Sequence, residues 1–298
     1  MASTTAMFAD DKLLYDAECD CCEEKPAASR TCTVVSDVST LSRWAKEWNT
    51  VFNAAKSANI IVSRQRLTPA AAPFSMDDTV IPRPPVSKHL GVLLSDRLSW
   101  ADHVKFLLSK VQPKVALLRW MTCRLRLPAF VIERCYLTLV RPILEYAGPA
   151  WNGCRVVDTT TLEKLQLRIA PSVLRQRGAR LSNSAVLQCV RWPTLAWRRR
   201  LKSLCLFWKL QNNLGPPSLS AAVPASASQR ASRYSLRKPA NLAFPSCSSR
   251  QHLKSFIPFC VALRNDLPAP IQSSPSLSSF RRSVIDHFAG DCYVYGLP

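Results

Sequence analysis

The spacing of apolar residues along the chain predicts helices over much of its length. Steps of three and four residues place apolar side chains on one face of a helix, where they can be buried. The first such run is expected to end near Asn53. Pro113 lies inside the second run and is expected to kink or split that helix. The runs fall at 34–52, 104–118, 132–140, 159–170 and 194–212.

The ends of two of these helices carry their own signals. Pro128 is expected at the first helical position, where its missing N–H costs nothing. Asp158 is a candidate N-cap for a helix over 159–170. Pro171 is expected to interrupt the segment that follows. The inward stripe of the helix after Pro128 is predicted to be Ile132, Cys135, Tyr136, Leu139 and Val140.

Shorter apolar segments bounded by turn residues predict strands. Residues 1–18 are predicted to form a hairpin with the Asp10–Asp11 pair at its turn, since Asp favours turns. A strand is expected at 59–63, before a Pro-rich connection. A second hairpin is predicted over 88–100, with Ser95, Asp96 and Arg97 as its turn. Helices following a few short strands indicate an α+β protein.

Composition divides the remainder of the chain. Residues 214–254 are rich in Pro and Ser and are expected to form a linker with little regular structure. Residues 255–288 regain apolar side chains and are expected to dock back on the helices, and Trp208 is expected in the core. With 47% hydrophobic residues the chain can bury a core, and no apolar stretch is long enough to span a membrane. A secretory signal is not expected near Met1, so the 12 Cys are interpreted as reduced thiols.

Charge is the strongest compositional signal. The chain has 40 Lys and Arg against 20 Asp and Glu, a formal net charge of +20. Between Lys164 and Asn265 there are 18 basic residues and no carboxylate. Such a stretch attracts a polyanion, and nucleic acid is the commonest one. The alternative is a basic surface that is simply solvated.

Adjacent carboxylates at a hairpin turn are candidate metal ligands. Asp10 and Asp11 bring two negative charges close together, and Mg²⁺ prefers oxygen ligands of this kind. An ordinary Asp-Asp turn is the alternative for an isolated pair. Cys19, Cys21 and Cys22 are also clustered, but no second Cys or His pair with zinc-site spacing accompanies them.

The Asp-Asp pair is one of several motifs that occur in a fixed order. Downstream lie a Trp-containing helix end at 44–48 and a Phe-Asn-x-x-Lys-Ser segment. A His-Leu-Gly hairpin and a conspicuous Leu-Val-Arg-Pro-Ile-Leu-Glu-Tyr-Ala stretch follow. The motifs stand at 8–11 (FADD), 52–57 (FNAAKS), 88–92 (KHLGV), 98–100 (LSW), 139–147 (LVRPILEYA), 255–258 (SFIP), 265–268 (NDLP) and 278–281 (SSFR). This order resembles the reverse transcriptase of non-LTR (LINE-type) retrotransposons, in the jockey-like and CR1-like groups.

The resemblance implies a fold and an activity. It implies the end of a polymerase palm, with two β-hairpins and a helix at 1–100. A mostly helical thumb at 101–213, a linker at 214–254 and an irregular basic tail at 255–298 would follow. The implied activity is RNA-directed DNA polymerisation, by transfer of nucleotides from dNTPs to a DNA primer along an RNA template. Nuclear action is implied as well, because such elements copy themselves at chromosomal DNA.

Roles for individual residues follow from the same resemblance. Asp10 and Asp11 would hold Mg²⁺ as catalytic carboxylates, and Lys56 would lie near the incoming triphosphate. The alternative role of Lys56 is a solvated lysine at a helix end. The hairpin residues His89, Leu90 and Gly91 would grip the primer end, the alternative being a buried strand.

The basic run at 198–202 is a further candidate contact with nucleic acid. Arg198, Arg199, Arg200 and Lys202 are predicted to bind phosphates. The alternative is the exposed face of a helix whose Leu201 and Leu204 pack inward. Three nearby tryptophans, Trp192, Trp197 and Trp208, could stack on single-stranded bases.

Departures from the family pattern limit the expected activity. In the family a further catalytic Asp lies on a palm strand well upstream, whereas this sequence starts nine residues before Asp10. Two-metal chemistry with a ligand missing is expected to fail. Arg264 also stands where the family usually has Trp. We therefore expect an inactive fragment of the polymerase, with a catalytically dead nucleic-acid-binding remnant and a non-functional remnant as alternatives.

Overall fold

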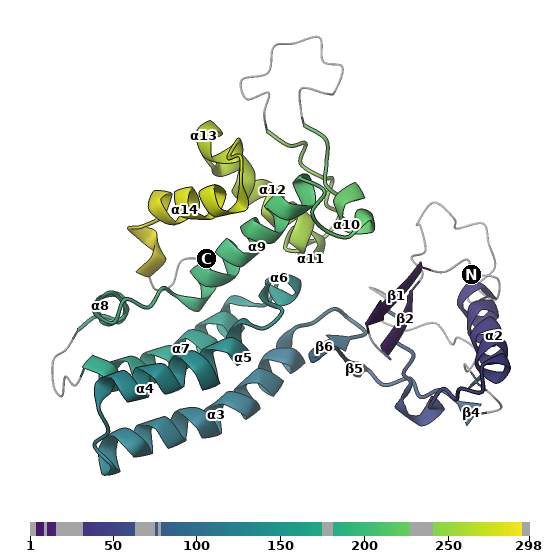
Figure 1. Ribbon diagram of the computed structural model, residues 1–298, viewed down its shortest axis with the longest axis horizontal. Helices are drawn as coiled ribbons and strands as arrows, with labels where there is room; N and C mark the ends of the chain where they lie inside the picture. The colour runs from purple at the N-terminus through teal and green to yellow at the C-terminus, as the bar shows by residue number, and fades with distance from the viewer. Residues whose placement is uncertain are drawn as a thin grey trace, which may run out of the picture. The chain divides into compact units, whose positions relative to one another are not determined.

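The structure is a computed structural model in which residues 4–8, 11–15, 32–62, 75–76, 79–174, 181–226 and 241–293 are described. The chain divides into two compact units, Met1–Ser99 and Trp100–Pro298. Short antiparallel strand pairs occur in the first unit and helices make up the second (Figure 1). The coarse α+β prediction is therefore confirmed. No helix among the described residues is long and apolar enough to cross a membrane.

The first unit begins with the predicted hairpin. Strands β1 (Thr4–Phe8) and β2 (Asp11–Tyr15) pair antiparallel, and Phe8 lies opposite Asp11. The hairpin prediction is confirmed for these strands. Asp10 and the clustered cysteines at 19, 21 and 22 lie outside the described residues, so the predictions made for them concern sequence only.

Helix α2 (Cys32–Glu47) is shorter than its apolar pattern predicts. It ends because Asn49 adopts a left-handed φ of 48°, which asparagine tolerates better than most residues. The N–H of Thr50 then bonds the Ala45 carbonyl at 2.9 Å, closing a Schellman-type cap. Phe52 keeps the helical spacing in sequence but lies beyond the cap. The predicted end near Asn53 is therefore wrong by about one and a half turns of helix.

The strand predicted at 59–63 is also wrong over its described residues, 59–62, which form no strand. The Asn59 N–H instead bonds the Pro82 carbonyl at 3.0 Å. Two short strands that the sequence did not indicate, β3 (Ser75–Met76) and β4 (Thr79–Val80), pair nearby in sequence. Val38, Met76 and Ile81 form the small core of this unit.

The second hairpin is present, but with a different turn. Strands β5 (Val86–His89) and β6 (Val92–Ser95) pair so that His89 lies opposite Val92. The turn is therefore Leu90–Gly91, with φ values of 45° and 81°. Two positive φ values in a two-residue loop match the twist of paired strands, and Gly tolerates this conformation best. The turn predicted at Ser95–Arg97 exists, but it follows the hairpin and is closed by a Leu98 N–H bond to the Ser95 carbonyl at 3.0 Å.

Helices α3, α4 and α5 open the second unit. α3 (Ala101–Arg124) is unbroken although it contains Pro113, so the predicted split is wrong. Pro113 lies on the exposed face, where water can satisfy the freed carbonyl. α4 (Ala129–Cys135) begins directly after Pro128, which is its N-cap rather than its first residue. A π-helical turn, η3 (Tyr136–Val140), joins α4 to α5 (Arg141–Glu145).

Two predictions fail around the next helices. Leu139 is 51% exposed and leaves the inward stripe, because the π-turn rotates the residues within it. After α6 (Gly148–Trp151), helix α7 (Val156–Leu174) begins before Asp158 and continues through Pro171. Asp158 is not its N-cap; instead, it forms an ion pair with Arg155 at 3.0 Å in the first turn.

Helix α8 (Asn183–Cys189) leads to α9 (Leu195–Gln211), which organises the C-terminal half of the unit. The predicted helix at 194–212 is confirmed, since Thr194 is the N-cap and accepts a bond from the Trp197 N–H at 3.2 Å. A short helix α10 (Pro217–Ala221) lies in the segment predicted to have little regular structure.

The C-terminal segment is helical, so the expectation of an irregular tail is wrong, but it docks on α9 as the apolar pattern predicts. Its helices are α11 (Arg250–Leu253), α12 (Phe256–Asp266), α13 (Ala269–Gln272), α14 (Leu277–His287) and the short η5 (Asp291–Tyr293). α12 and α14 pack against α9 (Figure 1). Trp208 of α9 is buried, as predicted, and its ring stacks on Phe280 of α14 at 6.3 Å between centroids.

The main core of the second unit lies among α3, α4, η3, α7 and the start of α9. Its largest fully buried side chains include Trp151, Tyr136, Ile132 and Leu144. A second cluster joins α9 to α13 and α14, and a third joins α9 to α12. This packing fixes the surface side chains described next.

Candidate nucleic-acid interface

The predicted catalytic carboxylates belong to the first hairpin. Asp11 is the first residue of β2 and pairs with Phe8 of β1. Asp10 and the side chain of Asp11 lie outside the described residues. Among the described side chains, no group of three or more His, Cys, Asp or Glu could hold a metal ion.

Lys56 lies in a short 3₁₀ turn, η2 (Ala54–Lys56), whose N-cap is Asn53. The Asn53 Oδ1 accepts a bond from the Lys56 N–H at 3.1 Å, and the lysine side chain is exposed. Ala54 of this turn and Leu14 of β2 both pack against the core formed by Val38, Met76 and Ile81. The turn with Lys56 and the hairpin with Asp11 therefore rest on one shared core.

The His89, Leu90 and Gly91 group lies at the tip of the β5–β6 hairpin. His89 ends β5 and is half-buried, whereas Leu90 and Gly91 form the turn itself. The alternative that these residues form a buried strand is therefore wrong for Leu90 and Gly91. A protruding turn of this kind can approach a ligand through its backbone, because Gly91 has no side chain.

The basic run on α9 is arranged around a carboxylate that the sequence did not single out as a site residue. Arg198 donates to both oxygens of the buried Glu145 from α5, the Nη2–Oε2 bond measuring 3.1 Å. Lys202 Nζ lies 2.7 Å from Glu145 Oε2, and Arg141 Nε lies 3.6 Å from Oε1. Glu145 follows Arg141 by four residues, so both fall on one face of α5.

The charges around Glu145 do not cancel. Three cations surround one carboxylate, which leaves a local charge of +2. Burial by itself raises the pKa of Glu145, but hydrogen bonds from Arg198 and Lys202 outweigh it, and the pKa lies below its usual value. Burial, and then the Arg198 charge, lower the pKa of Arg141. The Lys202 side chain is 45% exposed, so part of the surplus charge faces solvent.

Arg199 points into the protein, between its two basic neighbours. It is 1% exposed, and its guanidinium lies over the Trp151 ring at 5.0 Å from the centroid. Gly148 provides space for it, because a Cβ there would lie 3.2 Å from the Arg199 Cγ. The expected exposed face therefore does not include Arg199, whereas Leu201 and Leu204 pack inward as expected.

A second basic surface follows the exposed side of α3. Lys105, Arg119, Trp120 and Arg124 are exposed there, with Trp120 at 52%. Lys105 forms an ion pair with Asp102 at 3.4 Å. The other face of the helix packs on α7 and α4. Cations next to an exposed aromatic ring suit a polyanion that carries flat bases.

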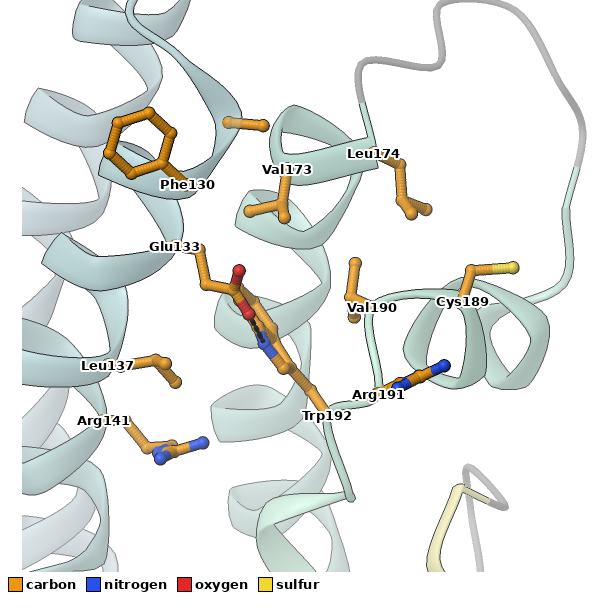
Figure 2. A pocket seen from close by; sticks show the side chains of 11 residues that line it. Phe130, Glu133, Leu137, Arg141, Val173, Leu174, Cys189, Val190, Arg191 and Trp192 are labelled. Carbon is orange, nitrogen blue, oxygen red and sulfur yellow. Dashed lines mark hydrogen bonds between the residues drawn. The ribbon is translucent and has the colours of Figure 1, made fainter.

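A pocket opens between α4, α7 and α8, and sequence reasoning did not find it (Figure 2). Its volume is about 600 Å³. Trp192 forms one wall and is held in place by stacking on Tyr136, with 4.2 Å between ring centroids. The Trp192 Nε1 donates to Glu133 Oε1 at 3.1 Å, as the dashed line in Figure 2 shows. The sequence offered Trp192 as a base-stacking candidate, but its ring is buried.

Comparison with curated proteins links this chain to mobile elements. It is 31% identical over 171 residues to a probable RNA-directed DNA polymerase from transposon X-element of Drosophila melanogaster. It is 27% identical over 165 residues to the probable polymerase from transposon BS, and 23% over 175 residues to that of mobile element jockey, both from the same fly. Its homologues are RNA-directed DNA polymerases. The resemblance to the non-LTR retrotransposon enzymes is thereby confirmed.

The similarity covers part of each protein. The alignments include 55–58% of this chain but 17–18% of the length of the relatives. No protein-family model matches the chain, and no solved structure matches it.

Proposed function

We propose that this chain is part of a non-LTR retrotransposon reverse transcriptase, contributing the end of the palm and the thumb. The observation that supports this most directly is the similarity to three transposon polymerases over more than half of the chain. The proposed boundaries are a partial palm at 1–100, a thumb at 101–213, a linker at 214–254 and a tail at 255–298. In the whole enzyme the reaction is nucleotidyl transfer from dNTPs to a primer along an RNA template.

In the proposed palm, Asp10 and Asp11 would hold Mg²⁺. Adjacent carboxylates are hard oxygen ligands, so the donor chemistry of this pair fits the ion. When bound, Mg²⁺ would activate the primer 3′-hydroxyl and stabilise the leaving pyrophosphate. The exposed Lys56 would then supply positive charge near the triphosphate, and the Leu90–Gly91 turn would contact the primer end.

In the proposed thumb, two basic surfaces would contact the template–primer duplex. The cluster around Glu145 holds Arg198 and Lys202 in fixed positions, with a surplus of positive charge. A cation held in place loses less side-chain entropy on binding a phosphate. The α3 surface with Lys105, Arg119 and Trp120 provides the second contact. Such contacts bind the backbone without reading its sequence.

A chimeric polymerase tests the proposed function. This chain, from its Asp10–Asp11 hairpin onward, would replace the corresponding hairpin and following region of the X-element polymerase. We expect Mg²⁺-dependent primer extension on an RNA template, which Asp10→Asn abolishes and the matched control Asp158→Asn leaves unchanged. A chimera that folds and binds template–primer but extends it equally with and without Asp10→Asn would overturn the assigned role.

The chain by itself is proposed to lack polymerase activity, since it matches only 17–18% of the length of its relatives. Primer extension by the isolated chain, sensitive to Asp10→Asn, would refute this part of the proposal.

A nucleic-acid-binding remnant without catalysis is the second candidate, and the surplus charge around Glu145 favours it. Affinity for an RNA–DNA duplex should then fall steeply with salt, because binding releases counterions from the phosphates. Lys202→Gln should reduce the slope of log affinity against log salt by about one. Arg155→Gln is the matched control, because Arg155 pairs with Asp158 one to one, whereas Lys202 shares Glu145 with two other cations. Affinity that does not change with salt would contradict both candidates.

A further inference from the structure

We propose that the pocket between α4, α7 and α8 binds one guanine nucleotide of a single-stranded RNA. The choice of a nucleic acid as its ligand rests on the proposed function, but the choice of base and strand rests on the pocket. The volume of about 600 Å³ falls within the range of small-molecule sites, so the pocket can admit a nucleotide.

Phe130 provides a platform for a base. It lies at the start of α4 and is 71% exposed, although it lines the pocket (Figure 2). An exposed aromatic ring at the edge of a concave site stacks readily on an unpaired base. Val173 and Leu174 of α7 and Val190, which directly follows α8, form the apolar wall. A base in a continuous duplex is already stacked on its neighbours, so this arrangement favours a single strand.

Glu133 provides the base discrimination. Its Oε1 accepts the Trp192 Nε1–H at 3.1 Å, and Oε2 has no hydrogen-bond donor among the described residues. Tyr136 stacks on Trp192 and donates to Gln166 Oε1 at 2.6 Å, so the carboxylate is held by a chain of fixed side chains. A carboxylate only accepts hydrogen bonds. Guanine presents two adjacent donors on its Watson–Crick edge, whereas adenine presents one donor beside an acceptor.

Arg141 and Arg191 provide positive charge for the phosphates. Both line the pocket together with Glu133, so the lining carries a net charge of +1. Arg141 also faces Glu145 at 3.6 Å, and Arg191 is exposed. Figure 2 shows Arg141 and Arg191 on one side of Glu133 and Phe130 on the other. With the Watson–Crick edge of the base facing Glu133, the arginines would therefore lie toward the phosphates of neighbouring nucleotides of the strand.

The backbone around the pocket is unusual in two places. The π-turn Tyr136–Val140 contributes Leu137 to the lining, and π-turns inside α-helices occur frequently at functional sites. Arg191 has a left-handed φ of 57° because it closes a Schellman-type cap on α8, in which the Trp192 N–H bonds the Leu187 carbonyl at 2.9 Å. Both features place side chains in the pocket, in accord with a ligand site.

Binding of the full chain to short RNAs tests the inference. The probes are fluorescent oligouridines with one central guanosine or one central adenosine, measured by anisotropy at fixed salt. We expect the guanosine probe to bind about tenfold more tightly, as for a base read by a good bidentate contact. Phe130→Ala should weaken binding of both probes by about tenfold, since one stacking contact is lost. The matched control is Phe244→Ala, another exposed phenylalanine, outside the pocket lining.

Glu133→Gln separates base recognition from stability. Glutamine keeps an oxygen to accept the Trp192 N–H, so the pocket wall should persist. Its amide would face the guanine donors with a donor of its own, so the preference for guanosine should fall to about one. Arg191→Gln should weaken the binding of both probes and lower the slope of log affinity against log salt. The control is Arg282→Gln, since Arg282 is exposed and lies outside the pocket lining, and it should leave the guanosine preference unchanged.

The outcomes distinguish this inference from the proposed function. If the chain binds RNA–DNA duplex but the Phe130, Glu133 and Arg191 variants bind both probes like the parent, the pocket inference is overturned and the function stands. If neither duplex nor single strand binds, the proposed function itself fails. Equal affinity for guanosine and adenosine probes, with a loss for Phe130→Ala alone, would refute base selection.

Discussion

The two units of this protein differ in how their candidate functional residues are supported. In the described part of Met1–Ser99, five apolar residues are buried and three of them form one cluster, while Lys56 and the Leu90–Gly91 turn lie on short exposed turns. In Trp100–Pro298 a single cluster contains nineteen buried residues, and Arg198 and Lys202 of α9 are bonded to the buried Glu145. The residues that motif reasoning finds first therefore belong to the less densely packed unit.

This difference indicates that stability and candidate chemistry are separated along the chain. Burial of apolar area is the main favourable term in folding, so the helical unit should carry most of the stability. The first unit buries few large side chains among its described residues and should open more readily. The helical unit also holds part of its excess positive charge in fixed positions, because Glu145 binds some of its cations and Arg199 is buried.

The largest expected effect is the loss of a fully buried tryptophan from the helical unit. Trp151 is 0% exposed and packs on His103 and Arg199. Trp151→Ala should lower the free energy of unfolding by about 4 kcal/mol, because it leaves a cavity in the core. Urea denaturation of the full chain measures this. Trp44→Ala, at a position 46% exposed in α2, should cost less than about 1 kcal/mol, and equal losses would contradict the comparison.

The next effect concerns the ionic cluster of the same unit. Glu145→Ala should cost about 3 kcal/mol at neutral pH, because it removes the shared partner of partly buried Arg141, Arg198 and Lys202. The exposed pair of Asp102 and Lys105 provides the control, and Asp102→Ala should cost under about 1 kcal/mol. Since the pKa of Glu145 is lowered, its stabilising effect should disappear as the pH falls through that lowered value. An acid titration of stability with no difference between parent and variant would refute this role.

Glu163 should give the opposite dependence on pH. Burial raises its pKa to about 7, although it accepts the Ala196 N–H at 2.8 Å and faces Arg199. The folded protein then binds a proton that the unfolded chain has lost between about pH 4.5 and pH 7, so this group makes stability fall as pH rises through that window. The change should be on the order of 2 kcal/mol between about pH 5 and pH 8.

Glu163→Gln should remove this decrease while keeping an acceptor for Ala196. Denaturation of parent and variant at both pH values provides the measurement. A variant that is destabilised equally at both pH values would show that the ionised carboxylate, rather than its neutral form, is the one that fits the core.

The smallest effect concerns the turn in the first unit. Gly91→Ala should cost about 1 kcal/mol locally, because φ is 81° there and an added side chain is strained in that conformation. Faster hydrogen exchange of the β5–β6 amides, with unchanged exchange in α9, would confirm that the two units open separately. Gly290→Ala, where an added Cβ meets nothing within 4 Å, is the control. Loss of protection in both units for Gly91→Ala would show that they unfold together.

The accuracy of the sequence predictions depended on how local the deciding interaction is. The helix at 194–212 was predicted closely because Thr194 is a cap within the same segment. The first helix was predicted too long because its apolar spacing continues past Asn49, and the left-handed turn there ends the helix regardless of spacing. The second hairpin was assigned the wrong turn because Ser, Asp and Arg look more turn-like than Leu90–Gly91, although strand register selected the latter.

The candidate functional residues also divide into those that local sequence identifies and those that only folding brings together. The motif residues of the first unit could be named from their order in sequence, and the relationship to transposon polymerases was found in this way. The pocket could not be found, because Phe130, Glu133 and Trp192 come from segments about sixty residues apart. The Glu145 cluster could not be found from the sequence either, because α5 and α9 are brought together only by the packing of the core.

By itself the sequence determined where most helices form, which family the chain resembles and that it carries a large positive charge. These properties depend on residue type and on spacing within one segment. Only the tertiary structure decided which basic side chains face solvent, since Arg198, Arg199 and Lys202 are close in sequence yet differ in exposure and partners. The physical reason is that a helix places successive residues about 100° apart around its axis, so the packed neighbours of each face determine whether a charge is buried, paired or free to bind.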